Sequence, residues 1–190
     1  AVILKDTISM LQDIYLTKNT DNQFLGDLFE GFLNRGVHQS EGQFFTPMPI
    51  VRFLVSSLPL RQLIEGGEIP KAIDYACGAG HFLTEYARQI RPFIEDKMNL
   101  QNEHDLKARE EKLAAECFKY YEQIVGIEKD YRLSKVSQVA AFMYGMDGIH
   151  IHYGDGLEEI PSIKDHTYSV LVANPPYSVS GFMETLTEED

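Results

Sequence analysis

The sequence predicts an α/β protein in which about four parallel strands form one sheet with helices packed against it. Short apolar runs alternate with longer segments of helical periodicity, which favours a parallel sheet with right-handed crossovers. Three of the runs are followed by a glycine or an acidic residue at their carboxyl ends. The fourth ends in Asn174-Pro175-Pro176, and two prolines cannot continue a hydrogen-bonded ladder because neither has a backbone N–H.

The composition limits the classes of protein that fit. The chain has 190 residues, 44% of them hydrophobic, which is ample for a core of one domain with an appendage. No apolar run approaches the ~20 residues of a membrane helix, and the two cysteines have no metal-site spacing, so we expect a cytoplasmic protein. A net charge of −12 is unfavourable for binding nucleic acid by this chain alone.

The amino-terminal part reads as a separate helical segment, residues 1–40, ahead of a second unit at 41–190. Residues 3–16 and 20–36 carry apolar side chains at helical spacing, and Gly36 is suited to end the second helix. Thr46 followed by Pro47 predicts the N-cap and first position of the next helix. The chain ends soon after Tyr177, so we expect the second unit to be truncated there.

The remaining elements follow from periodicity and from glycine and proline punctuation. Residues 59–70 read as a loop, and Pro92 is expected to end the helix that begins at His81. A charged segment at 101–122 predicts a solvated helix with many salt bridges. The predicted strands are 72–76, 123–128, 149–153 and 168–173, and a further helix covers 133–143.

The carboxyl ends of the first three strands predict a cofactor site. Gly78 and Gly80 lie in a strand-to-helix turn, where the backbone can approach a carboxylate or phosphate closely. Glu128 ends the second strand, where an acid can bind both ribose hydroxyls, and Asp155 follows the third. No third glycine suits a pyrophosphate, so a nucleoside carrying a small zwitterion, S-adenosylmethionine, fits better than a dinucleotide.

The fourth strand predicts a site for a planar –NH2 group. Asn174 is held extended because it precedes a proline. Its amide oxygen and the carbonyl of Pro175 can accept the two hydrogens of an amine, and the ring of Tyr177 can stack on the flat system that carries it. His150 and His152 would share one face of a strand, but no third ligand is evident and we predict no metal site.

Taken together, five motifs resemble those of N6-adenine DNA methyltransferases of the gamma class. They are residues 42–47, 74–83, 126–128, 154–157 and 174–177. The Gln-Phe-Phe-Thr-Pro wording and the preceding helices look most like the modification subunit of type I restriction-modification systems. The resemblance implies a Rossmann-like methyltransferase sheet, of which this chain would hold about four strands, and a subunit that acts with DNA, a specificity subunit, a second modification subunit and a restriction subunit.

The resemblance also implies roles for individual residues. Asn174, Pro175, Pro176 and Tyr177 would form the catalytic motif, with Asn174 and the Pro175 carbonyl accepting the N6 hydrogens and Tyr177 stacking on the flipped adenine. The positions that would bind the cofactor are Phe45, Thr46, Pro47, Asp74, Ala76, Cys77, Gly78, Gly80, Phe82, Glu128, Lys129, Asp155, Gly156 and Asn174. Tyr75 and Ala79 depart from the family pattern, which usually has a proline and a small hydroxyl residue there.

Two alternatives to adenine methylation stay open. A methyltransferase acting on a protein glutamine amide also uses Asn-Pro-Pro-Tyr, although the Phe-Phe-Thr-Pro motif argues against it. A cofactor-binding assembly module, inactive on its own, would agree with the acidic charge and the truncated sheet.

Overall fold

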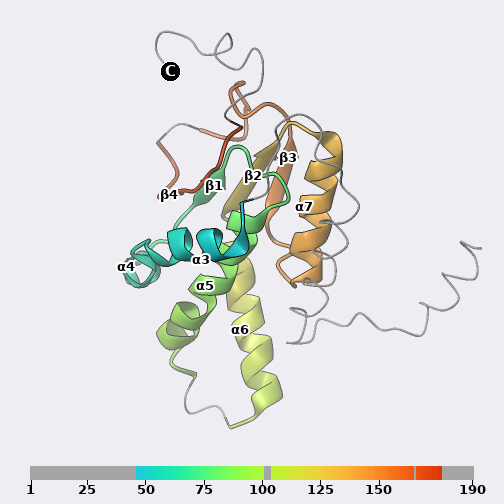
Figure 1. The fold of residues 1–190 in the computed structure, drawn as a ribbon. Helices are drawn as coiled ribbons and strands as arrows, with labels where there is room; N and C mark the ends of the chain where they lie inside the picture. Colours follow the sequence, from blue (N-terminus) through green and yellow to red (C-terminus); the bar gives the residue numbers. More distant parts are fainter. Residues whose placement is uncertain (1–45, 101–103, 165, 177–190) are drawn as a thin grey trace, which may run out of the picture.

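A computed structural model describes residues 46–100, 104–164 and 166–176 of the chain. In this part of the chain, four strands form a single sheet in the order β3-β2-β1-β4, and every neighbouring pair is parallel. The strands are β1 Ala72–Asp74, β2 Ile124–Glu128, β3 His150–Tyr153 and β4 Val170–Leu171. The α/β class is therefore confirmed, and the first strand lies between the second and the fourth (Figure 1).

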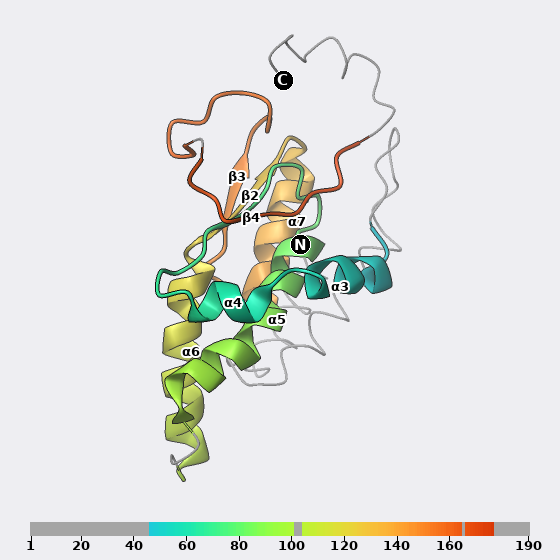
Figure 2. The ribbon, with the colours of Figure 1, turned by 90° about the vertical axis from the view of Figure 1, so that its left-hand side faces the viewer.

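Five helices accompany the sheet in the described residues: α3 Met48–Ser56, α4 Leu60–Glu65, α5 His81–Met98, α6 Leu106–Tyr121 and α7 Tyr131–Met143. Figure 2 shows α5 and α7 on one side of the sheet, with the connection from β3 to β4 on the other. The sheet face toward the helices carries Ala72, Ile124 and Val170, which belong to the main hydrophobic core. One covered face thus fixes the register of the strands, because a slip of one residue would turn these side chains away from the helices.

Helix α5 runs through Pro92 instead of ending before it, so the predicted end at this proline is wrong. Proline inside a helix costs about 3 kcal/mol. Ile90 and Ile94, on either side of it, are 1% and 0% exposed, and burying each stabilises the helix by about 1.5–3 kcal/mol. Packing on the core therefore outweighs the local penalty, and the helix ends at Met98, with Asn99 as its C-cap in the left-handed conformation (φ 53°).

Two further local predictions are corrected near the start of the described chain. The segment 59–70 is not all loop, because Leu60 and Ile64, one helical turn apart, are both buried and stabilise the short helix α4. The N-cap of α3 is Pro47, without a side-chain cap, and the helix begins at Met48. Thr46 therefore does not cap this helix, and its hydroxyl is available for another contact.

Helix α6 has both the predicted salt bridges and a buried face. Arg109 pairs with Glu95 and Arg91 pairs with Glu110, so two ion pairs join α6 to α5. Its inner face buries Leu113 and Cys117 in the hydrophobic core. The helix is thus an integral part of the crossover between β1 and β2, not a freely solvated insertion. The predicted segment 1–40 lies outside the described residues, and none of the described helices has the length and apolarity to cross a bilayer.

Candidate active site

The turn after β1 brings glycine backbone to the start of α5. The Cys77 N–H donates to the Ile127 carbonyl of the neighbouring strand (2.9 Å), and the Gly80 N–H donates to the Cys77 carbonyl (2.8 Å). Gly78 and Gly80 have φ values of +54° and +81°, which a side chain would strain. A Cβ on Gly80 would also lie 2.3 Å from the Ser137 hydroxyl, whereas one on Gly78 would meet nothing within 4 Å. The turn is tight against α7 at Gly80 and open to a ligand at Gly78.

Asp74 ends β1 as a buried carboxylate, with 1% of the residue exposed. Its Oδ1 accepts a hydrogen bond from the Ala76 N–H (3.0 Å), but its Oδ2 is buried without a hydrogen-bond partner. Burial, opposed by the Ala76 hydrogen bond and supported by the nearby Glu128 carboxylate, raises the pKa of Asp74 from 3.8 to about 7. An unpaired, buried acceptor beside an open glycine turn is the feature expected of a site for a positively charged group.

Glu128 ends β2 and turns toward the same glycine turn. Its Oε2 accepts from the Gly78 N–H (2.8 Å), and its Oε1 accepts from the Asp130 N–H (2.7 Å). A carboxylate has about four lone-pair positions, so two more remain for hydroxyl groups. The two backbone bonds therefore orient Glu128 without exhausting its capacity as an acceptor.

The segment after β3 makes an ion pair with the residue after β2 and a close backbone contact with the turn after β1. Lys129 donates to Asp155 Oδ2 (2.5 Å), and the Leu157 N–H donates to Asp155 Oδ1 (3.1 Å). The hydrogen bond from Lys129 is the main reason that the pKa of Asp155 is lowered. A Cβ on Gly156 would lie 2.2 Å from the Tyr75 carbonyl oxygen, so only glycine lets this loop lie against the turn after β1.

The fourth strand places Asn174 beside this turn. The Val172 N–H donates to the Ile73 carbonyl (3.1 Å), which continues the pairing of β4 with β1 up to the start of the Asn-Pro-Pro segment. Asn174 Nδ2 donates to the Thr46 hydroxyl oxygen at 2.8 Å, across 128 residues of sequence. Thr46 of the first of the five motifs and Asn174 of the last therefore meet directly in space.

The structure brings most of the predicted positions to one end of the sheet. Hydrogen bonds join Ala76 to Asp74 and Gly78 to Glu128. A third hydrogen bond joins Asn174 to Thr46. The predicted cofactor positions Cys77 and Phe82 lie in the hydrophobic core, where burial raises the pKa of the Cys77 thiol and keeps it protonated. Pro47, Pro175 and Pro176 are among the described residues, whereas the predicted positions Phe45 and Tyr177 lie outside them.

Sequence reasoning missed two contacts in this region. Ser137 of α7 lies against Gly80, a small-residue contact between helices that the apolar periodicity of 133–143 could not reveal. The bond between Thr46 and Asn174 was hidden because Thr46-Pro47 is also a good helix-capping pair. The sequence did carry a signal for the contact between Thr46 and Asn174, since the motifs that contain these two residues were expected at the same site.

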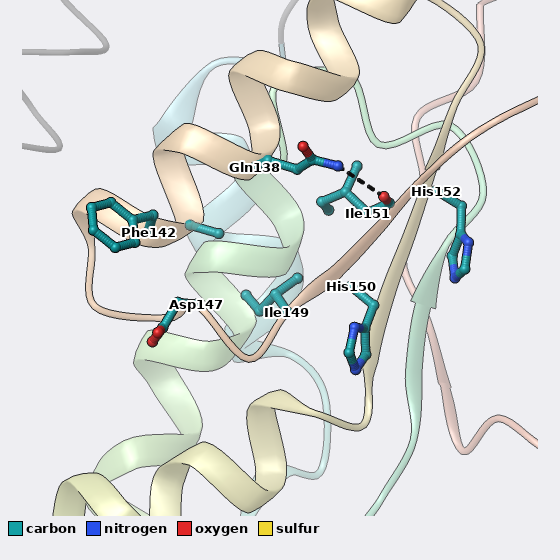
Figure 3. A pocket seen from close by; sticks show the side chains of 8 residues that line it. Gln138, Phe142, Asp147, Ile149, His150, Ile151 and His152 are labelled. Atoms are coloured by element: carbon teal, nitrogen blue, oxygen red, sulfur yellow. Dashed lines mark hydrogen bonds between the residues drawn. The ribbon is translucent and has the colours of Figure 1, made fainter.

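A separate groove of about 380 Å³ lies between α7 and β3, at the edge of the sheet (Figure 3). Gln138 Nε2 donates to the Ile151 carbonyl there (3.1 Å), and so occupies an acceptor on the outer edge of β3. His150 and His152 project from the strand on the side away from α7. No group of three potential metal-ligating side chains occurs in the described ranges. None of the residues that line this groove is a predicted cofactor or catalytic position, and we assign it no part in the chemistry.

The fold and site together define a Rossmann-like methyltransferase domain. It has a parallel sheet with a glycine turn and successive acids at the strand ends, and an Asn-Pro-Pro segment beside them. The chain belongs to the N-6 DNA Methylase family, whose model matches residues 20–190. This match confirms the family predicted from the five motifs.

Relatives of known description agree with this membership. The chain is 23% identical over 198 residues to the type I restriction enzyme MjaVII methylase subunit of Methanocaldococcus jannaschii, covering 99% of this chain and 29% of that protein. It is also 23% identical over 249 residues to the type II restriction enzyme and methyltransferase RM.Eco57I of Escherichia coli, covering 96% of this chain and 24% of that protein. The chain thus spans less than a third of the length of these relatives.

Solved structures confirm the fold. A crystal structure described as the modification subunit of a type I restriction enzyme from Vibrio vulnificus superposes with a TM-score of 0.64 at 21% identity, over 98% of this chain and 36% of that one. A crystal structure described as a class I S-adenosylmethionine-dependent methyltransferase from Listeria monocytogenes superposes with a TM-score of 0.54 at 18% identity, over 92% of this chain and 45% of that one.

Proposed function

We propose that this chain is the catalytic part of a modification subunit that transfers a methyl group from S-adenosylmethionine to N6 of adenine in DNA. The observation that carries the proposal is the pairing of β4 with β1. This pairing sets Asn174 beside the turn that follows Asp74. The group that would bind the target amine and the residues that would bind the cofactor therefore lie together at the carboxyl ends of neighbouring strands. Family membership supports adenine as the base and DNA as the substrate.

The residues present fit S-adenosylmethionine by the chemistry of their donors and acceptors. The buried, unpartnered Oδ2 of Asp74 would accept from the ammonium group of the methionine part. The glycine turn, which leaves open space at Gly78, would hold the methionine carboxylate, Glu128 would accept from the ribose hydroxyls, and Asp155 would bind the adenine end. The cofactor supplies a methyl group made electrophilic by a sulfonium.

The chain's own contribution is to hold the target amine. The N6 lone pair of adenine is delocalised into the ring, which makes this nitrogen a poor nucleophile. Asn174 Oδ1 and the Pro175 carbonyl oxygen would each accept one N6 hydrogen, so that the lone pair localises and points toward the methyl group. Both acceptors extend from a strand end fixed by β1, and such preorganised acceptors lower the barrier without a covalent intermediate. Tyr177 would stack on the base once it has left the duplex.

The partners belong to the same proposal. The net charge of −12 leaves little attraction for DNA phosphates, so most of the basic surface would come from other parts of the assembly. We expect a specificity subunit, a second modification subunit and a restriction subunit, in a cytoplasmic complex. The described relative from Methanocaldococcus jannaschii is a methylase subunit of a type I restriction enzyme, which supports this arrangement.

The test is an Asn174→Ala exchange in the full-length protein with its partner subunits. We expect the methylation rate to fall at least about 100-fold, because one fixed acceptor is lost from the reacting centre. The Kd for cofactor, measured by calorimetry, should stay within about twofold of the wild type, because Asp74 and Glu128 are proposed to hold the ammonium group and the ribose of the cofactor.

Methylation-sensitive sequencing of host DNA, with and without the intact gene, identifies the substrate. Loss of N6-methyladenine with the gene supports the proposal. Unchanged DNA together with loss of methylation on a protein glutamine would replace it by the glutamine alternative. Loss of cofactor binding together with activity in Asn174→Ala would make Asn174 a structural residue.

A further inference from the structure

The hydroxyl of Thr46 is used by Asn174 and not by the helix that follows it. Helix α3 begins at Met48 with Pro47 as its N-cap and with no side-chain cap. Thr46 Oγ1 instead accepts a hydrogen bond from Asn174 Nδ2 at 2.8 Å. Both residues are partly buried, so water competes only in part for this contact.

A primary amide has two different ends, and only one of them suits an amine. Its nitrogen carries two donors and its oxygen is an acceptor. If the nitrogen of Asn174 faced the target –NH2 group, donors would oppose donors. The bond to Thr46 engages the nitrogen end, and thereby turns the oxygen end away from Thr46.

We propose that Thr46 is a positioning residue that fixes which end of the Asn174 amide meets the target amine. This role rests on the proposed function, and it differs from the contact with the methionine end of the cofactor that the family resemblance implies. Thr46 would act through Asn174, and would touch neither the base nor the methyl donor.

The backbone at Asn174 is restrained, so rotation of the side-chain amide is the motion that must still be fixed. Pro175 restricts Asn174 to extended conformations, and the Val172 N–H bond to Ile73 fixes the strand just before it. The terminal torsion of asparagine has broad, roughly two-fold preferences, so the torsional preference alone selects poorly between the two amide orientations. A hydrogen bond to a fixed acceptor selects one of them.

The other partner is also held in place. The Pro47 carbonyl accepts from the N–H groups of Ile50 and Val51, which ties the segment to the first turn of α3. The buried Glu85 of α5 accepts from Gln89 Nε2 (2.6 Å), and the same Gln89 nitrogen donates to the Arg52 carbonyl of α3 (3.2 Å). Helix α3 is therefore anchored on α5, whose first residues follow the glycine turn.

The experiment compares Thr46→Val, which keeps the shape and removes the hydroxyl, with Thr46→Ser, which keeps the hydroxyl. Both are made in the full-length methylase subunit within its complex. Single-turnover methylation at saturating cofactor should slow about 2- to 12-fold in Thr46→Val, the range that the net contribution of one hydrogen bond corresponds to. Thr46→Ser should recover the wild-type rate to within about twofold, with the Kd for cofactor unchanged in both variants.

An activity-independent measurement follows the amide itself. The side-chain NH2 resonances of Asn174, assigned by their loss in Asn174→Asp, should shift in Thr46→Val and stay in place in Thr46→Ser. A wild-type rate in Thr46→Val would overturn the positioning role while leaving the methyltransferase function intact. A raised cofactor Kd in Thr46→Val, with no rescue by serine, would assign Thr46 to the cofactor instead. A wild-type complex that leaves adenine unmethylated would remove both proposals.

Discussion

Replacing Asp74 by asparagine should stabilise the protein above neutral pH while weakening its hold on the cofactor. Asp74 is 1% exposed and its pKa is raised to about 7 by burial, so ionising it in the folded state is costly. Between pH 3.8 and about 7 the folded state binds the Asp74 proton more tightly than the unfolded chain. The free energy of unfolding therefore falls as pH rises through this window.

The size of the effect follows from the same values. The window spans a little over three pH units, and each unit corresponds to about 1.4 kcal/mol, which gives an upper limit of about 4 kcal/mol. Asparagine cannot ionise, and its oxygen can keep the 3.0 Å bond from the Ala76 N–H. Its buried NH2 group would lack a partner, which costs about 1–3 kcal/mol. We expect a net gain of about 1–3 kcal/mol at pH 8 and a deficit below pH 5.

Urea unfolding of both proteins at pH 5, 6, 7 and 8 measures this difference. The wild type should lose stability relative to Asp74→Asn as pH rises, whereas Glu68→Gln, an exposed acid in the segment before β1, should follow the wild type. Cofactor affinity should rise with pH up to about 7 in the wild type, because the carboxylate is needed for the ammonium group, and this rise should vanish in Asp74→Asn. Parallel stability curves for wild type and Asp74→Asn would refute the reasoning.

Two further exchanges test the packing around the site and the sheet edge. Gly156→Ala should destabilise the protein by about 1–3 kcal/mol in thermal or urea unfolding, because the new Cβ would lie 2.2 Å from the Tyr75 carbonyl oxygen. Gly154→Ala is the matched control, since its new Cβ would have no neighbour closer than 4.0 Å. Equal losses of stability in the two variants would contradict the contact between Gly156 and Tyr75. Gln138→Ala should expose the Ile151 carbonyl on the edge of β3 and raise the fraction of associated species in sedimentation velocity, and an unchanged distribution would show that this edge needs no cover.

The sheet could be predicted because each of its signals is local. Glycines and acids follow the first three strands directly in the sequence, and two prolines follow the fourth. The run at 168–173 was readable as a strand, although only Val170–Leu171 has regular strand geometry. The observed pairing of β4 with β1 agrees with the Rossmann-like methyltransferase sheet that the family resemblance implies.

The errors arise where contacts distant in sequence decide the outcome. Pro92 is a strong local signal, but Ile90 and Ile94 bury themselves against residues far along the chain and carry the helix past it. Thr46 has the right side chain for a helix cap, yet its partner lies 128 residues away. No local pattern encodes such a choice, because a hydroxyl serves either partner equally well.

The position of β1 between β2 and β4 means that the geometry of the site depends on backbone pairing more than on particular side chains. In the proposed reaction, the turn after β1 holds the methionine end of the cofactor, and Asn174, after the neighbouring strand β4, holds the target amine. Strands in a sheet lie about 4.8 Å apart whatever their side chains are. The spacing of the two half-sites is therefore set by backbone pairing between β1 and β4. The helical crossover between β1 and β2 can lengthen, as the presence of α6 shows, without altering that spacing.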